Sequence, residues 1–269
     1  MTDRTIGFIG AGLMAEALAD GIIHSGVVSA EDVYASDPDE ERREVFQQKI
    51  GDHVYEDNRK VARHADVLVL AVKPQVLPRV AQHISEKVED AHLVVSIAPG
   101  IKLASLERWL DTDRLIRVMP NTPALVGEGA SGFAAGRGTT ESDIETVEAI
   151  LGAVGRCVKV KEELMDAVTG LSGSGPAFLF IALEAMADAG VEAGLSREQA
   201  MELAAQTMRG AATLAQETDM HPAELKDAVT TPGGTTAAGL HALETAGLRA
   251  AFMNSVQAAV EKGRSLGSD

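Results

Sequence analysis

The sequence predicts an α/β fold, in which a doubly wound parallel sheet is followed by an all-helical region. Three observations predict it. A glycine-rich turn separates a short apolar strand from a helical pattern within residues 5–23, and short apolar segments then alternate with helical ones as far as residue 160. Beyond residue 162 nearly every stretch has helical spacing. Because alternating strands and helices build parallel sheets, we expect one domain over residues 1–161 and an all-α domain over residues 162–269.

The first turn has the form of a dinucleotide fingerprint. Residues 5–9 read as a strand, and residues 10–15, GAGLMA, follow as G-x-G-x-x-A before a helix. Gly10 permits the tight turn, Gly12 lets the backbone approach a pyrophosphate, and the small Ala15 lets the helix pack close to the strand. The first domain is therefore predicted to be a dinucleotide-binding Rossmann domain.

The remaining elements of this domain follow in order. Further strands are predicted at residues 33–36, 54–55, 66–71, 93–97, 115–119, 129–135 and 154–160. Helices are predicted at residues 40–48, 75–88, 103–110 and 141–151. In doubly wound sheets, ligands bind at the carboxyl ends of the strands. The residues directly after each strand are therefore the candidates for a site.

The end of the second strand carries contradictory signals about the cofactor. A carboxylate there binds the adenosine ribose hydroxyls, whereas a serine or an arginine favours a 2′-phosphate. Asp37 favours NADH, but Ser36, with Arg42 and Arg43 close behind, is compatible with NADPH. Both cofactors therefore stay open.

Two later strand ends add candidates. Residues 71–74, AVKP, lie where a nicotinamide ribose would pass, and Lys73 is either a cofactor ligand or an ordinary surface lysine. Asn121, between Pro120 and Pro123, can orient a carboxamide or a small substrate, or it can simply form an Asx-turn. These strand ends outline one edge of a cleft.

The composition describes a packed, acidic protein. Hydrophobic residues make up 45%, and 24 basic against 40 acidic side chains leave a net charge of −16. This charge argues against nucleic acid and anionic membrane surfaces as partners. Cys157 is the only cysteine, so it forms no intramolecular disulfide and is expected to be a buried thiol in a reducing compartment.

Other features point to a cytoplasmic protein without a metal. The chain shows no signal-peptide pattern, and no apolar run reaches about 18 residues, so neither secretion nor a membrane span is expected. The seven histidines are scattered, with no pair at ligand spacing beside a carboxylate, so no metal site is predicted. His221 precedes Pro222 and is expected to begin a helix rather than act as a base.

The second half opens with a long apolar helix. Residues 170–176, GLSGSGP, introduce it, with Pro176 suited to the first helical position. Its polar residues recur every four positions, at Glu184, Asp188 and Glu192. A helix that is apolar around most of its circumference is buried on most sides, so we expect it to pack against a second subunit. Ser196 and Gln199 form a predicted capping box for the next helix.

A hydroxyl-rich loop interrupts these helices. Residues 229–236, VTTPGGTT, contain a proline and two glycines, which end any arriving helix. A run with helical spacing follows over residues 237–246. The amides of a new helix N-terminus then lie among several hydroxyls, which favours an anion. A plain connection between two capped helices is the alternative.

Three stretches resemble signature segments of the pyrroline-5-carboxylate reductase family. They are residues 7–12, residues 166–177 and residues 225–244, which include the hydroxyl-rich loop. Residues 71–74 and 121–123 also match, so the resemblance covers essentially the whole chain. It implies a Rossmann domain and a helical domain that interlocks with that of a partner in a homodimer or an assembly of dimers.

The resemblance also implies a reaction and a cofactor site. The reaction is hydride transfer from NADPH or NADH to the imine carbon of 1-pyrroline-5-carboxylate, giving L-proline in the last step of its synthesis. Leu13 and Asp37 depart from the residues usual in the family. The implied cofactor-binding residues, with their neighbours in the same turns, are Gly10, Ala11, Gly12, Leu13, Met14, Ser36, Asp37, Asn58, Ala71, Val72, Lys73, Pro74 and Asn121.

The chemistry of a cyclic imine suits the hydroxyl-rich loop. Such a substrate needs a hydride at carbon, a proton for nitrogen and donors for one carboxylate. Thr236 is the candidate proton donor or relay, with water as the competing source. The predicted substrate-binding residues are Ser174, Gly175, Thr231, Gly233, Gly234, Thr235 and Thr236.

Other functions are compatible with the same architecture: a reductase of another imine, a β-hydroxyacid dehydrogenase and a nucleotide-binding regulator. A β-hydroxyacid dehydrogenase needs the pattern G-x-x-G-x-G-x-x-x-K-x-x-x-N, but Leu179 and Leu183 occupy its lysine and asparagine positions here. A regulator that binds a nucleotide without turnover is the third possibility, since a fold alone does not establish a function. The intact loop argues against the regulator.

Overall fold

The computed structural model describes residues 3–266. Contacts divide the chain into two compact units. The sheet unit runs to Ser174 and includes the end of the chain from Ala259, and the helical unit is Gly175–Ala258. The contacts place residues 162–174 with the sheet unit. The predicted domain boundary at 161/162 stays a prediction.

The sheet has the strand order β3-β2-β1-β4-β5-β6-β7-β8. The strands are β1 (Ile6–Ile9), β2 (Val33–Ser36), β3 (Val54–Tyr55), β4 (Val67–Leu70), β5 (Leu93–Ser96), β6 (Leu115–Met119), β7 (Gly129–Ala135) and β8 (Gly155–Lys159). All neighbouring pairs are parallel except β6 and β7. The predicted doubly wound sheet is confirmed, and it contains one antiparallel pair. Only residues 120–128 join β6 to β7, which is too short for a parallel crossover.

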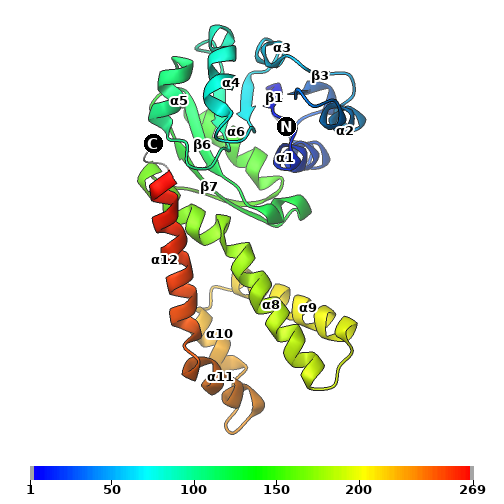
Figure 1. Ribbon diagram of the computed structural model, residues 1–269, viewed down its shortest axis with the longest axis vertical. Coiled ribbons are helices and arrows are strands. Elements are labelled where there is room, and N and C mark those ends of the chain that lie inside the picture. Colours follow the sequence, from blue (N-terminus) through cyan, green and yellow to red (C-terminus); the bar gives the residue numbers. More distant parts are fainter. Residues whose placement is uncertain (1–2, 267–269) are drawn as a thin grey trace. The chain divides into compact units, whose positions relative to one another are not determined.

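Helices flank the sheet (Figure 1). They are α1 (Leu13–His24), α2 (Glu40–Ile50), α3 (Asn58–Ala62), α4 (Leu77–Ile84), α5 (Leu103–Leu110), α6 (Glu141–Gly152) and α7 (Met165–Val168). Short 3₁₀ turns occupy η1 (Ala30–Asp32), η2 (Ser85–Lys87), η3 (Thr122–Val126) and η4 (Glu162–Leu164), and η5 (Thr169–Gly173) is a π-helical turn. The helix predicted over 75–88 is shorter, because the Lys73-Pro74 turn precedes it and η2 ends it.

Two apolar layers, one on each face of the sheet, form the core. Phe8 of β1 belongs to the layer that contains Leu18 of α1, Phe46 of α2 and Ile150 of α6. Ile9, the next residue, belongs to the other layer, with side chains from α3, α4 and α5. Alternate residues of one strand thus serve both layers, which is the doubly wound arrangement predicted. Cys157 of β8 is half-buried rather than buried, and partial burial raises the pKa of its thiol.

A buried carboxylate ties the amino ends of β1 and β6 to α6. Asp143 forms a capping box with Thr140 at the start of α6, and its side chain is 0% exposed. The guanidinium groups of Arg4 and Arg114 lie 2.6 and 2.7 Å from it. Burial by itself raises the pKa of the Asp143 carboxyl, but hydrogen bonds from Arg114, Thr140 and Arg4 outweigh it and hold that pKa well below its usual range.

The helical unit contains α8 (Gly175–Glu192), α9 (Arg197–Glu217), α10 (Pro222–Ala228), α11 (Thr235–Thr245) and most of α12 (Leu248–Leu266). The predicted capping box of Ser196 and Gln199 is confirmed. His221 likewise caps α10, since its Nδ1 accepts a hydrogen bond from the Ala223 amide, so its predicted role at a helix start is confirmed. Helix α8 begins one residue before Pro176.

The buried core of the helical unit is small. Its cluster of buried hydrophobic residues consists of Ala187, Ala200 and Ala204 within the described residues. Large apolar side chains of the same unit are exposed in the single chain, among them Phe180 at 63% and Ile181 at 69%. The helices α8 and α9 pack on each other through small residues and leave their larger ones uncovered.

Candidate active site

A pocket of about 730 Å³ lies at the carboxyl ends of β1, β2 and β4. Seven of the predicted cofactor residues line it: Gly10, Gly12, Asp37, Asn58, Ala71, Val72 and Lys73. The other lining residues are Pro38, Asp39, Arg42, Glu56, Val76, Arg79, Val80 and His83. Residues from three separate strand ends therefore meet in one concave site, as the parallel sheet requires.

The glycine turn has the geometry that a pyrophosphate needs. Gly10 has φ +98°, and a Cβ there would lie 2.8 Å from the Ala71 carbonyl oxygen, so no other residue fits. A Cβ on Gly12 would instead meet nothing within 4 Å. Gly12 is the N-cap of α1 without a side-chain cap, which leaves the amides of the first helical turn facing open space. This cradle fits an anionic cofactor group.

The neighbouring residues of the turn have different surroundings. Ala11 is buried, and its amide donates a 2.9 Å hydrogen bond to Asp37 Oδ2. Leu13 is 57% exposed, and Met14 packs against the core. None of these three, nor Pro74, lines the pocket, so their predicted cofactor contacts stay predictions.

Ser36 faces a neighbouring loop rather than the pocket. Its side chain is buried, and its hydroxyl donates a 2.9 Å hydrogen bond to Asn58 Oδ1. Asn58 opens the short helix α3, which Asp57 caps by accepting a hydrogen bond from the Arg59 amide. Hydrogen bonds from Arg59 hold the pKa of Asp57 well below its usual range. Ser36 thus positions Asn58, which does line the pocket.

Asn121 uses both ends of its side chain within the sheet unit. Its Nδ2 donates to the Ser172 carbonyl oxygen at 3.0 Å, and its Oδ1 accepts from the Ala130 amide at 2.8 Å. No side-chain cap forms at η3, so the Asx-turn alternative is wrong. Asn121 therefore holds the π-helical turn that leads to Ser174, and its contact with a cofactor stays a prediction.

Close packing also shapes the π-helical turn. A Cβ on Gly173 would lie 2.8 Å from Met119 Cε, and one on Gly132 of β7 would lie 2.6 Å from Val168 Cγ1. Two glycines thus let residues 165–173 lie against β6 and β7. π-helical turns are rare and occur often at functional sites. The segment GLSGSGP thus begins within a π-helical turn that packs closely against β6 and β7.

The hydroxyl-rich loop lies in the helical unit. Gly233 has φ +71°, and Gly234 is the N-cap of α11 without a side-chain cap. A Cβ on Gly234 would lie 2.3 Å from Thr231 Oγ1. The Thr230 hydroxyl donates a hydrogen bond to the Lys226 carbonyl oxygen. Thr235 and Thr236 form the first turn of α11. The loop thus presents uncapped amides beside hydroxyls, as an anion site does.

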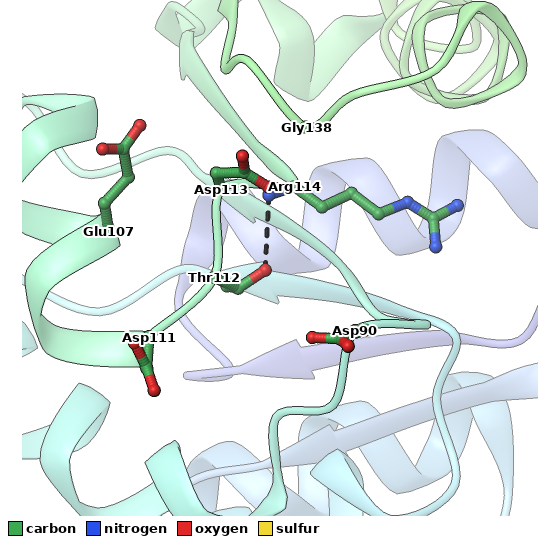
Figure 2. Close-up of a pocket in the computed structure, with 7 residues that line it drawn as sticks. All are labelled: Asp90, Glu107, Asp111, Thr112, Asp113, Arg114 and Gly138. Atoms are coloured by element: carbon green, nitrogen blue, oxygen red, sulfur yellow. Dashed lines mark hydrogen bonds between the residues drawn. The ribbon is translucent and has the colours of Figure 1, made fainter.

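A second pocket, of about 400 Å³, lies at the opposite, amino ends of the strands. Figure 2 shows its carboxylates, including Asp90 and Asp111, with the Arg114 amide bonded to Thr112. Ligands of doubly wound sheets bind at the carboxyl ends, so this pocket is no candidate active site. Within residues 3–266, no group of three or more His, Cys, Asp or Glu side chains is placed to hold a metal ion.

One helical stretch, Glu162–Glu192, is long and apolar enough to cross a membrane by length and composition alone. It contains the exposed apolar side chains of α8, and only 11% of its most apolar window is buried. A helix that packs against another subunit passes the same test.

Two family profiles match the chain. One, described as pyrroline-5-carboxylate reductase dimerisation, matches residues 162–266. The other, described as NADP oxidoreductase coenzyme F420-dependent, matches residues 5–100. The first covers the helical unit and the second covers the glycine turn and the strands that line the pocket.

Curated relatives match over nearly their whole length. The pyrroline-5-carboxylate reductase of Methanosarcina acetivorans is 50% identical over 268 residues, which cover 99% of each chain. That of Arabidopsis thaliana is 49% identical over 262 residues, which cover 97% of this chain and 95% of the relative.

Solved structures agree with these relatives. The pyrroline-5-carboxylate reductase of Coxiella burnetii superposes with a TM-score of 0.95 at 35% identity, and covers 100% of both chains. The pyrroline carboxylate reductase of Plasmodium falciparum, with NADP bound, superposes with a TM-score of 0.87 at 34% identity and the same coverage.

Proposed function

Because the chain belongs to the pyrroline-5-carboxylate reductase family, we propose that it reduces 1-pyrroline-5-carboxylate to L-proline with NADPH or NADH. This is the last step of proline biosynthesis. The observation that carries the proposal is the 50% identity to a curated relative over 99% of both chains. The pocket beside the glycine turn supports it independently.

The sheet unit would hold the cofactor. The bound nicotinamide supplies the hydride that reduces the imine carbon. The open space at Gly12 and the uncapped start of α1 suit the pyrophosphate, and Asp37 and Asn58 line the end of the pocket beside β2. Lys73, exposed at the end of β4, adds a positive charge to the same pocket. The chain's own contribution here is binding and orientation.

The hydroxyl-rich loop would hold the substrate. The amides of Thr235 and Thr236, in the first turn of α11, can donate to the substrate carboxylate. The Gly234 amide already donates to the Thr231 carbonyl oxygen, so Gly234 would shape the site. Thr236 is half-buried in the first turn of α11 and would pass a proton to the imine nitrogen, directly or through water. Thr231 and Gly233 shape the loop, and Ser174 and Gly175 are further proposed substrate contacts.

The active form would be a homodimer or an assembly of dimers. The match to a dimerisation region over residues 162–266 supports this, as does the exposure of large apolar side chains on α8. We place the enzyme in the cytoplasm, with a small molecule as its substrate. The net charge of −16 speaks against binding to nucleic acid.

The β-hydroxyacid dehydrogenase and the regulator fit less well. Leu179 and Leu183 still occupy the lysine and asparagine positions of the β-hydroxyacid dehydrogenase pattern. A 3-hydroxyisobutyrate dehydrogenase of Mycobacterium tuberculosis superposes with a TM-score of 0.53 at 16% identity, which reflects the shared fold alone. No observation favours a regulator without turnover.

The test is a steady-state assay with 1-pyrroline-5-carboxylate, run with NADH and with NADPH, each at low and high salt. We expect loss of reduced-nicotinamide absorbance and formation of L-proline in equal amounts. The control substrate is 1-pyrroline, which has the imine without the carboxylate and should show a much lower kcat/KM. If a folded sample turns over pyrroline-5-carboxylate with neither cofactor, the proposed function is wrong.

A further inference from the structure

We propose that Asp37 makes this chain select NADH over NADPH, by accepting hydrogen bonds from the adenosine ribose hydroxyls and repelling a 2′-phosphate. The inference rests on the proposed function only for the binding of a nicotinamide dinucleotide. The sequence leaves the choice open, because Asp37 is accompanied by Ser36, Arg42 and Arg43. The structure distinguishes these four side chains by what each is bonded to.

The Asp37 carboxylate is held in place at the pocket. Its Oδ2 accepts the Ala11 amide at 2.9 Å, and its Oδ1 accepts the Asp39 amide at 2.9 Å. The first bond joins it to the glycine turn, and the second joins it to its own loop. Turning the carboxylate away from the pocket would leave the amide of the buried Ala11 without this partner. A 2′-phosphate that displaced the Asp37 carboxylate would therefore break this hydrogen bond.

Two of the groups that would favour NADPH are already engaged. The Ser36 hydroxyl is buried and donates to Asn58, so it does not line the pocket. The Arg43 guanidinium donates to the carbonyl oxygens of Asp37 and Pro38, each at 2.9 Å. Arg43 thus clamps the loop that carries Asp37, and it reinforces the position of the carboxylate.

Arg42 is the remaining cation at this end of the pocket. It lines the pocket and forms no hydrogen bond or ion pair within residues 3–266. Three carboxylates line the same pocket, those of Asp37, Asp39 and Glu56. One flexible arginine does not reverse the sign of the charge there.

The other cationic groups of the pocket belong to a different strand. Lys73, Arg79 and His83 follow β4, and β1 separates β4 from β2 in the sheet. Two strand spacings amount to roughly 10 Å, which is about a Debye length at 0.1 M salt. His83 in addition lies 3.1 Å from Asp57 Oδ1. These groups therefore suit other parts of a dinucleotide better than its 2′ position.

The physical consequence is a difference between two otherwise identical ligands. The ribose of NADH offers two hydroxyl donors to a fixed acceptor. NADPH replaces one donor with a phosphate, which brings like charges together, and such a repulsive element is how binding sites reject a close analogue. We expect the Kd for NADPH to exceed that for NADH by about tenfold or more.

The test measures equilibrium binding to the full chain, in the absence of pyrroline-5-carboxylate. Titration calorimetry with NADH, NADPH, ADP and 2′,5′-ADP, at one fixed ionic strength, gives the preference for the intact cofactors and for fragments without nicotinamide. In Asp37→Asn the side chain keeps its size and one acceptor, which can serve the Ala11 amide, and it loses its charge and the acceptor for the Asp39 amide. We expect this variant to lower the NADPH/NADH Kd ratio by about tenfold.

The matched control is Glu44→Gln. This change removes one negative charge from the neighbouring helix α2, at an exposed residue that does not line the pocket. We expect its Kd ratio to stay within about twofold of the unaltered chain. Asp37→Ser is a second variant for the case in which Asp37→Asn does not fold.

Three results would overturn the proposal. The unaltered chain could bind NADPH as tightly as NADH, the Asp37 variants could leave the ratio unchanged, or Glu44→Gln could shift the ratio as much as Asp37→Asn does. The result of the turnover assay is independent of the binding result. A chain that binds NADH tightly without reducing pyrroline-5-carboxylate would refute the proposed function and leave this inference standing.

Discussion

The sheet unit and the helical unit differ in how completely the chain covers its own apolar residues. In the sheet unit, Phe8, Phe46 and Phe133 are fully buried, and both faces of the sheet are covered by helices of the same chain. In the helical unit, the buried cluster consists of three alanines within the described residues, and Phe180 and Ile181 remain exposed. Both units are rich in apolar residues, yet only the sheet unit buries its large apolar side chains within the single chain.

This difference teaches which function each unit can perform by itself. The cofactor pocket is lined entirely by residues of the sheet unit, whose core one chain completes. The hydroxyl-rich loop belongs to the unit that lacks a core of comparable size. We therefore expect cofactor binding to be a property of the single chain, and turnover to depend on the surface that covers α8. Variants in each unit can test whether cofactor binding and turnover are separable in this way.

The largest effect is expected from Ile181→Asp on the exposed face of α8. A charge there would face the apolar surface of a second copy, and the loss of a central interface contact costs 2 kcal/mol or more, roughly a 30-fold change in the dimer constant. We expect the dimer to dissociate at micromolar concentration and turnover to fall by about 100-fold or more. Sedimentation and the turnover assay measure these changes, and titration should show unchanged NADH binding.

Glu184→Gln on the polar stripe of the same helix is the control for Ile181→Asp. Glu184 is exposed in the single chain, and its change should leave the oligomeric state alone. If the Ile181 variant keeps its oligomeric state and its full turnover, the helical unit does not depend on a partner at this face.

The next largest effect is expected from Asp143→Asn, which tests whether the sheet unit is stabilised by its own buried ion pairs. Removing one charge of a buried ion pair usually costs about 3–5 kcal/mol, because the remaining charges lose their partner. Arg4 and Arg114 would be left facing a neutral amide. Urea unfolding should show the loss in the sheet unit, and Asp90→Asn, an exposed change, is the control. An unchanged midpoint would show that the cluster adds little to stability.

The same carboxylate predicts a pH dependence. The pKa of Asp143 in the folded chain lies below its usual range, so the folded state favours the ionised form. Its contribution to stability is present above the unfolded-state pKa of about 3.9 and is lost as the pH falls below that value. The free energy of unfolding should therefore fall less steeply below about pH 4 in Asp143→Asn than in the unaltered chain.

An intermediate effect is expected from Thr236→Ala in the hydroxyl-rich loop. If Thr236 passes the proton, kcat should fall by about 100-fold, the usual size of a general-acid contribution. NADH binding should not change, because the loop lies outside the sheet unit. Thr236→Ser should restore most of kcat. Thr245→Ala, which removes a hydroxyl bonded to His241 within the same helix, is the control.

A Thr236→Ala variant with full kcat would assign the proton to water. The proposed reaction would still stand in that case, since the amides of the loop would still bind the substrate carboxylate.

The smallest effect is expected at Asn121, which lies at the end of the sheet unit. Asn121→Asp keeps an acceptor for the Ala130 amide but cannot donate to the Ser172 carbonyl oxygen, so it removes one bond of two. Loss of one such bond costs about 1 kcal/mol, which corresponds to roughly a fivefold fall in kcat/KM. Asn121→Ala, which loses both bonds, should have a larger effect.

The NADH titration separates the two roles considered for Asn121. A residue that positions the π-helical turn should change kcat/KM and leave the Kd for NADH unchanged. A weaker Kd in Asn121→Asp would instead support a direct contact with the cofactor.

Much of the fold follows from local patterns in the sequence. The buried strands β2 and β6, the helix α5 and the capping box at Ser196 needed only residues near one another in the chain. The short helix α3 and the π-helical turn were not predicted, because five residues carry too little periodicity to reveal either one. The antiparallel β7 depends on the length of one connection rather than on its own residues.

The sequence by itself determined the order of the elements, the glycine turn, the hydroxyl-rich loop and, through its motifs, the family. These depend on residue types at close spacing, since turns, caps and strand periods are local properties of the chain. Only the tertiary structure decided which polar groups are already engaged. Ser36 and Arg43 look like phosphate ligands in the sequence, but Asn58 and two backbone carbonyls occupy them. Asp37 is held at the pocket partly by the Ala11 amide, which comes from a distant turn that no local pattern reveals.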